Sequence, residues 1–198
     1  MKKNGNDIHI EKHPLKPFLP SDARVLFLGS FPPPEKRWSM DFFYPNWNND
    51  MWRIFGQVFY DDVNAFVQSG TKKFDKKLLM EFLEEKGIAL YDVAVAVRRL
   101  KENASDAFLE IVEPADIPTI LAVLPNCNYI VTTGGKAAET LSLVLGSSPP
   151  AVGKSLIVEI GDRKVYHYRM PSSSRAYPLK FCEKVKAYRT LFEIIGMI

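Results

Sequence analysis

Four short segments of the sequence carry side chains that could bind or process a ligand. They are Gly29-Ser30-Phe31-Pro32, Asp92, Thr133-Gly134 and Met170-Pro171-Ser172-Ser173-Ser174-Arg175. Each follows a short apolar run that is typical of a strand. Because ligands of an open α/β sheet bind beyond the carboxyl ends of its strands, we expect these segments to meet in one site.

A fifth segment, Phe43 to Trp52, is rich in aromatic and amide side chains and extends from the first of these loops. Together the segments supply backbone N–H groups, amides, hydroxyls, one carboxylate and aromatic rings. Aromatic rings stack on the face of a planar heterocycle, while amides and N–H groups contact its polar edge. The inventory therefore favours a planar heterocycle over a sugar or a fatty chain.

The apolar periodicity predicts the elements that must position these side chains. Strands are predicted over residues 24–29, 88–93, 129–132, 156–160 and 164–168, the last two joined by a turn at Gly161-Asp162. Helices are predicted over about 50–59, 74–86, 116–124 and 135–145, with a last helix from about Pro178. This alternation indicates an α/β layer fold with a short, mainly parallel sheet, and we expect one domain over residues 1–198.

Helical spacing also predicts which side chains of these helices face the core. The expected buried residues of the first two helices are Met51, Ile54, Phe55, Val58, Leu78, Phe82 and Leu83. The last helix is expected to bury a stripe that includes Cys182 and to leave Lys184 on another face. Residues 1–20 mix prolines with lysines and histidines, so we expect an extended N-terminal arm that packs loosely.

The composition is that of an ordinary soluble globular protein. The chain has 198 residues, 46% of them hydrophobic, a net charge of +3 and two cysteines without metal-ligand spacing. We therefore expect neither a disulfide framework nor a metal site, and a reducing cytoplasm fits best. His9, His13 and His167 are widely separated, so surface or sheet positions are expected for them.

No segment has the features of export or membrane insertion. The apolar core of a signal peptide is missing, and no run approaches the roughly 18 apolar residues of a membrane span. We therefore expect a cytoplasmic protein without a membrane partner. The small positive charge permits a polyanionic partner without requiring one.

Several short motifs follow one another in a fixed order along the chain. They are Gly29-Ser30-Phe31-Pro32 after a buried strand, Tyr44 five residues before Asn49, Asn49-x-x-Trp52, the strand Gly87 to Val93, and Pro171-Ser172-Ser173-Ser174. In this order they resemble the uracil-DNA glycosylase superfamily, and most closely its branch linked to hypoxanthine as well as uracil. The resemblance covers about Val25 to Ala176.

The resemblance implies a three-layer α/β/α sandwich that flips a damaged base out of DNA and hydrolyses its N-glycosidic bond without a metal or cofactor. Flipping is required because this bond is inaccessible within the base stack. The base leaves as an anion from an oxocarbenium-like sugar, so donors aimed at the departing base oxygen should contribute most.

The resemblance also implies roles for individual residues. Backbone N–H groups around Ser30 and Phe31 would donate to the departing base, and Asn49 would position water or hold the base edge. Phe43, Tyr44 and Thr133 would form the base-binding side, with Tyr44 stacking on the base. Pro171, Ser172, Ser173 and Ser174 would grip the DNA phosphates, and Arg175 would fill the gap in the duplex. The implied partner is DNA with a damaged base. Nothing in the sequence demands more than a monomer.

The chain departs from the superfamily at several positions. Many members have Asp or Asn where Phe31 stands and His where Met170 stands, so neither of these groups can orient water or assist base departure here. The hypoxanthine-linked branch also lacks both groups. That branch usually has Gly, His and an amide where Pro33, Asn46 and Thr133 stand.

Simpler interpretations stay open for the same residues. Asn49 could cap the helix expected from about Asp50, and Tyr44 and Phe43 could belong to the core. Asp92 ends a buried strand, where its carboxylate either satisfies loop N–H groups or contacts the base or orients water. Two other functions remain: a module that binds nucleic acid or a nucleobase without cleaving it, and a nucleoside hydrolase.

Overall fold

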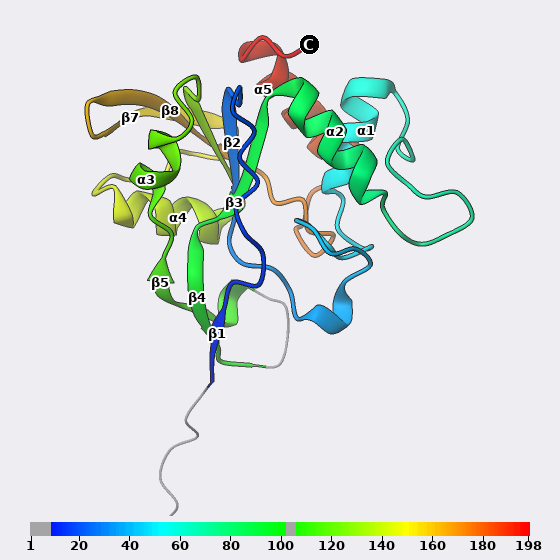
Figure 1. Ribbon diagram of the computed structural model, residues 1–198, viewed down its shortest axis with the longest axis horizontal. Coiled ribbons are helices and arrows are strands. Elements are labelled where there is room, and N and C mark those ends of the chain that lie inside the picture. Colours follow the sequence, from blue (N-terminus) through cyan, green and yellow to red (C-terminus); the bar gives the residue numbers. More distant parts are fainter. Residues whose placement is uncertain (1–8, 102–105) are drawn as a thin grey trace, which may run out of the picture.

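The computed structural model describes residues 9–101 and 106–198, and its centre is a five-stranded sheet (Figure 1). The strand order is β3-β2-β6-β8-β7. These strands are β2 Val25–Gly29, β3 Ile88–Asp92, β6 Tyr129–Thr133, β7 Lys154–Ile160 and β8 Arg163–Met170. All run parallel except β7, which pairs antiparallel with β8 at the edge. The predicted α/β fold with a short, mainly parallel sheet is confirmed.

Helices cover both faces of this sheet. They are α1 Met51–Tyr60, α2 Lys76–Lys86, α3 Ile117–Ala122, α4 Gly135–Val144 and α5 Phe181–Ile194. In Figure 1, α1, α2 and α5 lie on one side of the sheet, and α3 and α4 lie on the other. The ring of Phe27 in β2 lies 5.5 Å from that of Phe55 in α1 and 5.9 Å from that of Phe192 in α5. The helical layer of α1 and α5 therefore packs directly on the central strand.

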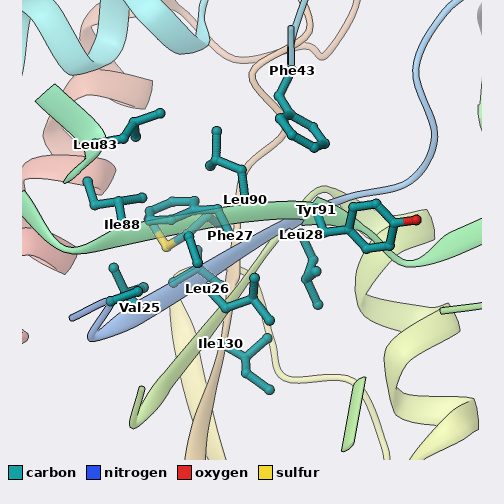
Figure 2. Packing of buried hydrophobic residues seen from close by; sticks show 14 of the residues in the cluster. Val25, Leu26, Phe27, Leu28, Phe43, Leu83, Ile88, Leu90, Tyr91 and Ile130 are labelled. Atoms are coloured by element: carbon teal, nitrogen blue, oxygen red, sulfur yellow. The ribbon is translucent and has the colours of Figure 1, made fainter. Parts of the chain in front are cut away.

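Strand β2 is buried along its whole length because strands flank it on both sides and helices cover both faces. This explains its uninterrupted apolar sequence, since a strand buried on both faces has no polar side to alternate with. Figure 2 shows its side chains in one cluster with Ile88 and Leu90 of β3 and Leu83 of α2. The cluster fixes the positions at which β2 and β3 end.

Two helix faces differ from the prediction, whereas the predicted face of α1 is buried. In α2, Leu78 is 43% exposed and its neighbour Leu79 is buried instead. The Leu78 N–H donates a hydrogen bond to the Asp75 side chain at the start of the helix. The helix packs on the sheet so that Leu79, and not Leu78, is buried. The last helix begins at Phe181, not near Pro178, and it exposes Cys182 and buries Lys184.

A second, three-stranded antiparallel sheet was not predicted. It has the order β1-β4-β5 and consists of β1 Ile10–Lys12, β4 Ala94–Arg99 and β5 Leu109–Pro114. The loose packing expected for the arm is wrong over its described part, because β1 pairs with β4 and Phe18 forms a bridge with Leu90. Residues 1–8 of the expected arm lie outside the described residues.

Two short 3-10 helices complete the regular elements of the described residues, Glu35–Arg37 after β2 and Asp106–Phe108 before β5. Within residues 9–101 and 106–198, every helix is too short or too polar to cross a membrane.

Candidate functional site

The four parallel strands end at one edge of the sheet, and this edge brings the predicted segments together. Gly29 at the end of β2 is in register with Asp92 at the end of β3. Thr133 at the end of β6 is in register with Met170 at the end of β8, next to the serine-rich loop. We call Gly29, Tyr44, Asp92 and Thr133 the strand-end cluster, because the contacts described below join them.

The Asp92 carboxylate packs directly against the backbone of β2. A Cβ placed on Gly29 would lie 2.3 Å from Asp92 Oδ1 and 3.7 Å from the Tyr44 hydroxyl. Since real Cβ atoms do not approach oxygen so closely, this contact requires glycine at position 29. Glycine here therefore lets a carboxylate approach the end of the central strand.

A histidine holds the second oxygen of this carboxylate. Nε2 of His13 lies 2.8 Å from Asp92 Oδ2, and the two side chains are only 1% and 9% exposed. The backbone O and N of Leu15 lie 2.8 and 3.1 Å from Nδ1 of the same ring, so both ring nitrogens are engaged. The surface or sheet position expected for His13 is wrong, because the β1–β4 pairing brings the start of the chain over Asp92. Among the described residues, Asp92 is partnered by this histidine rather than by loop N–H groups.

Tyr44 reaches the same cluster from the aromatic segment. Its hydroxyl lies 3.1 Å from Thr133 Oγ1, and its ring meets the ring of Trp52 edge-on at 5.8 Å. Burial, and to a smaller degree the charge of Asp92, raises the pKa of the Tyr44 hydroxyl. The phenol therefore stays protonated and can donate a hydrogen bond.

The backbone of Tyr44 has φ 48°, in the left-handed region that costs a tyrosine conformational energy. Such strained residues cluster at functional sites. The preceding Phe43 is only 3% exposed and lies against the rings of His13 and Tyr91, with centroids 6.3 Å away in each case. In this arrangement Phe43 is part of the packing behind the cluster.

The loop after β2 connects the cluster to a carboxylate that the sequence interpretation missed. Ser30 Oγ donates to Asp106 Oδ1 at 2.7 Å. Burial raises the pKa of the Asp106 carboxyl, and the hydrogen bond from Ser30 opposes this rise. Phe31 meets the His13 ring edge-on at 5.2 Å and lies 5.6 Å from the Arg99 guanidinium. Phe31 therefore packs behind the histidine that holds Asp92.

Asn49 joins the aromatic segment to the serine-rich loop. Its side-chain oxygen accepts a hydrogen bond from the N–H of Met51, the first residue of α1, at 2.9 Å, but the N-cap of this helix is Asp50, whose side chain makes no capping hydrogen bond. Its backbone forms an isolated antiparallel bridge with Ser174, and the Asp50 N–H donates to Ser173 O at 2.9 Å. The Asn49 amide nitrogen has no hydrogen bond within the described part of the chain, so it can still donate to a ligand.

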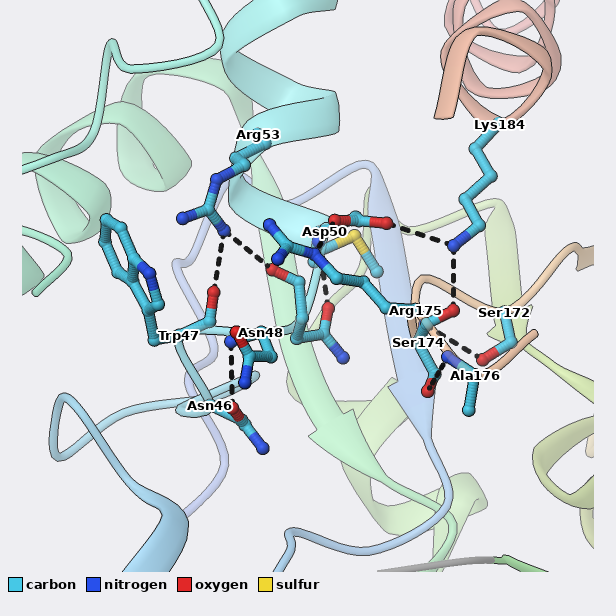
Figure 3. Close-up of polar contacts among 12 residues, drawn as sticks. Asn46, Trp47, Asn48, Asp50, Arg53, Ser172, Ser174, Arg175, Ala176 and Lys184 are labelled. Atoms are coloured by element: carbon cyan, nitrogen blue, oxygen red, sulfur yellow. Dashed lines mark hydrogen bonds and ion pairs between the residues drawn. The ribbon is translucent and has the colours of Figure 1, made fainter. Parts of the chain in front are cut away.

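The serine-rich loop, Pro171 to Arg175, is fixed from beneath by buried polar contacts (Figure 3). The Asp50 carboxylate pairs with Arg175 Nε at 2.9 Å and with Lys184 Nζ at 3.1 Å, and Lys184 also donates to Ser174 O at 2.7 Å. This carboxylate explains why Lys184 is buried instead of facing outward. The Tyr188 hydroxyl donates to Pro171 O at 2.9 Å.

The other side of this loop touches the end of β6. A Cβ on Gly134 would lie 3.3 Å from Ser172 Cβ, and Gly134 itself has φ 103°. The two loops that follow β6 and β8 therefore lie in contact. The residues predicted to contact phosphates therefore lie in a loop that buried polar contacts hold beside the strand-end cluster. Arg175 is half-exposed at the end of this loop.

The side chains gathered here can supply a carboxylate, a protonated phenol, hydroxyls and an amide. In the described ranges, no three His, Cys, Asp or Glu side chains are grouped so that they could hold a metal ion. These groups can donate and accept hydrogen bonds and can transfer protons.

Comparison with known proteins places this arrangement in a structural context. No family model matches the chain, and no curated protein matches it. Its fold is similar to the solution NMR structure of "a putative Uracil DNA glycosylase from Methanosarcina acetivorans", with a TM-score of 0.63 and 23% identity. The match covers 95% of this chain and 99% of that chain. The likeness thus extends over the whole α/β/α fold that brings the strand ends together.

Proposed function

We propose that this protein is a monofunctional DNA glycosylase that hydrolyses the N-glycosidic bond of a deaminated base, uracil or hypoxanthine, flipped out of DNA. The observation that carries the proposal is the buried Asp92, which is held by His13 at the end of the central strands. The braced serine-rich loop beside it and the similarity in fold to the archaeal protein support the same assignment.

In the proposed reaction, Asp92 orients the attacking water and accepts its proton. The water oxygen bonds to the anomeric carbon of the sugar while the bond from that carbon to the base nitrogen breaks, and the electron pair leaves with the base. His13 is a positioning residue that keeps the carboxylate aimed. Phe31 stands where many members of the superfamily have an acid or an amide, and it cannot orient water. We assign this role to Asp92, which ends a central strand, rather than to Asp106, which accepts a hydrogen bond from Ser30.

The departing base is held by groups around it. Backbone N–H groups of Ser30 and Phe31 donate to the base oxygen, where negative charge develops, and this is where a donor stabilises the transition state most. Tyr44 stacks on the base, with Thr133 and Phe43 behind it, and Asn49 donates to the base edge through its amide nitrogen.

The DNA strand lies along the serine-rich loop. Hydroxyls and N–H groups of Ser172, Ser173 and Ser174, which follow Pro171, contact phosphates, and such contacts fix the register of a protein on DNA. Because its Nε pairs with Asp50 at 2.9 Å, Arg175 is held at the end of this loop, and we assign it to the phosphate backbone rather than to the space that the flipped base leaves in the duplex. Flipping costs a few kcal/mol of unstacking, which these contacts must offset.

The test incubates purified protein with labelled oligonucleotides that carry one uracil or one hypoxanthine, single- and double-stranded, followed by alkaline cleavage of abasic sites. Asn49→Ala and Asp92→Asn are expected to lower base release far more than DNA binding, because both residues act on the reacting groups. Matched controls are Asn126→Ala and Asp162→Asn, two exposed residues just outside strands of the same sheet. Strand scission that is unchanged in Asp92→Asn would remove this residue from the mechanism.

The same assay separates this function from its rivals. Retained DNA binding without abasic product on any substrate would favour the non-cleaving module. Hydrolysis of free nucleosides with no effect on oligonucleotides would favour the nucleoside hydrolase.

A further inference from the structure

A second feature lies beneath the serine-rich loop, outside the strand-end cluster. The start of α1 and the start of α5 enclose an open pocket of about 510 Å³. Its polar lining consists of Asp50, Arg53, Arg175 and Lys184, and Leu179 and Phe181 lie on its apolar side.

The charges that line this pocket do not balance. Three cationic side chains face one carboxylate, and Asp50 already pairs with both Arg175 and Lys184. Arg53 has no carboxylate of its own among the described residues: its Nη1 donates to the carbonyls of Trp47 and Asn49 at 2.8 and 3.1 Å. Burying charge without a partner is costly, so this excess of positive charge favours an anionic ligand.

The two arginines are also held in place with donors to spare. The Arg53 guanidinium is 4.2 Å from the centre of the Trp47 ring and only its Nη1 is used within the described residues, while Arg175 uses only its Nε. Both side chains are therefore fixed before a ligand arrives. Planar guanidinium forks match the oxygens of a phosphate and bind it in bidentate fashion.

The electrostatics of Arg53 agree with this geometry. Burial and then the nearby charge of Arg175 lower the pKa of Arg53, and Asp50 only partly opposes them. The two guanidinium groups thus repel each other across the pocket. An anion between them would remove the repulsion.

We propose that this pocket binds one phosphate of the DNA strand that the serine-rich loop holds, between Arg53 and Arg175, with the adjoining nucleoside against Leu179 and Phe181. The inference rests on the DNA-binding part of the proposed function and adds a phosphate contact beyond the loop. Because Lys184 bonds both Asp50 and Ser174 O, a phosphate bound here is coupled to the position of the loop.

The test measures the affinity for an undamaged duplex by fluorescence anisotropy over a series of salt concentrations. Each phosphate contact contributes about 0.9 to the slope of log affinity against log salt for B-DNA. Arg53→Gln and Arg175→Gln should each reduce the slope by about this amount, and the double variant should lose no more, because both arginines share one phosphate. Lys164→Gln, at the opposite end of β8, is the matched control and should leave the slope unchanged.

A second measurement guards against a variant that merely disturbs the fold. Oligonucleotides with a single neutral methylphosphonate, scanned along the strand, should reveal one position that weakens binding to the wild type but not to the double variant. Arg53→Lys keeps the positive charge and loses the planar guanidinium group, so it should weaken the contact to that one phosphate and leave the other phosphate contacts unchanged.

Each outcome decides the inference. Unchanged slopes in both single variants, or a double variant whose slope falls by the sum of two contacts, would overturn the shared phosphate site. Stabilisation by inorganic phosphate that needs both arginines, with no sensitive methylphosphonate position, would overturn the DNA assignment in favour of a free phosphate. The slope is measured on an undamaged duplex and does not depend on catalysis. The predicted slope changes, together with no base release from the uracil or hypoxanthine oligonucleotides, would therefore refute the glycosylase and leave the phosphate site standing. Normal base release from the damaged oligonucleotides with unchanged slopes would overturn the phosphate site and leave the glycosylase standing.

Discussion

Replacing Gly29 by alanine is expected to abolish most base release while leaving the protein folded. The alanine Cβ would lie 2.3 Å from Asp92 Oδ1, whereas ordinary van der Waals contact begins at 3.4 Å. The carboxylate must therefore retreat by about 1 Å. Its other oxygen is bonded to His13 at 2.8 Å, so the retreat also strains or breaks this hydrogen bond.

The size of the effect follows from this displacement. A misplacement of about 1 Å in a reacting group can cost on the order of 100-fold in rate. Extra volume in a packed interior typically lowers the free energy of unfolding by about 1–3 kcal/mol. We therefore expect base release to fall by about two orders of magnitude in a protein that is only modestly destabilised.

The assay combines single-turnover base release, duplex affinity and urea unfolding at 25 °C. Gly56→Ala is the matched control, because its Cβ would lie 2.4 Å from the backbone oxygen of Asp62, remote from the strand-end cluster. This control should lose stability and keep its rate of base release under conditions where it is folded. A Gly29→Ala variant with the wild-type rate would refute the role of the Asp92 position in the reaction.

Two further predictions concern buried polar groups. Burial lowers the pKa of His167 to about 4 from 6.5, so the unfolded chain binds more protons than the folded chain between these two pH values. The protein therefore becomes less stable as the pH drops. Roughly 2 kcal/mol of the free energy of unfolding should be lost between pH 7 and pH 5. Urea unfolding at both pH values should show a smaller loss in His167→Gln, and an equal loss would contradict this origin. Lys184→Met leaves Asp50 with Arg175 alone and should cost about 3 kcal/mol of stability, since one partner of a buried ion pair is removed. Exposed Lys186→Met is its control, and a cost for Lys184→Met as small as that of the control would show that the buried pair contributes little.

Much of the central fold is readable from the sequence because its strands are buried on both faces. Strands β2 and β3 are apolar until Gly29 and Asp92, and the polar residues at their ends meet because parallel strands end at one edge. The second sheet lacks such a signal. The β4–β5 pairing shifts register between Ala94 and Val97, and an irregularity of this kind breaks the period-two alternation by which a half-buried strand is recognised.

The residues that sequence reasoning missed depend on contacts between distant parts of the chain. His13 meets Asp92 only because β1 adds to β4, and a lone histidine among prolines gives no sign of this pairing. From the sequence, Lys184 is expected to face solvent, because its partner Asp50 lies 134 residues earlier in the chain. Asp106 likewise becomes a site residue only through its hydrogen bond from Ser30.

The central place of β2 has a consequence for how the chain acquires its site. Pairing β2 with β3 joins Gly29 to Asp92, whereas Thr133 is brought to them by β6, which pairs with the other side of β2, and the serine-rich loop by β8, which pairs with β6. Such parallel pairings close long loops and are slow steps in folding. A chain in which β6 and β8 have not yet joined the sheet contains the Asp92 carboxylate without the serine-rich loop that is proposed to hold DNA. The complete site therefore depends on the finished sheet rather than on any local segment.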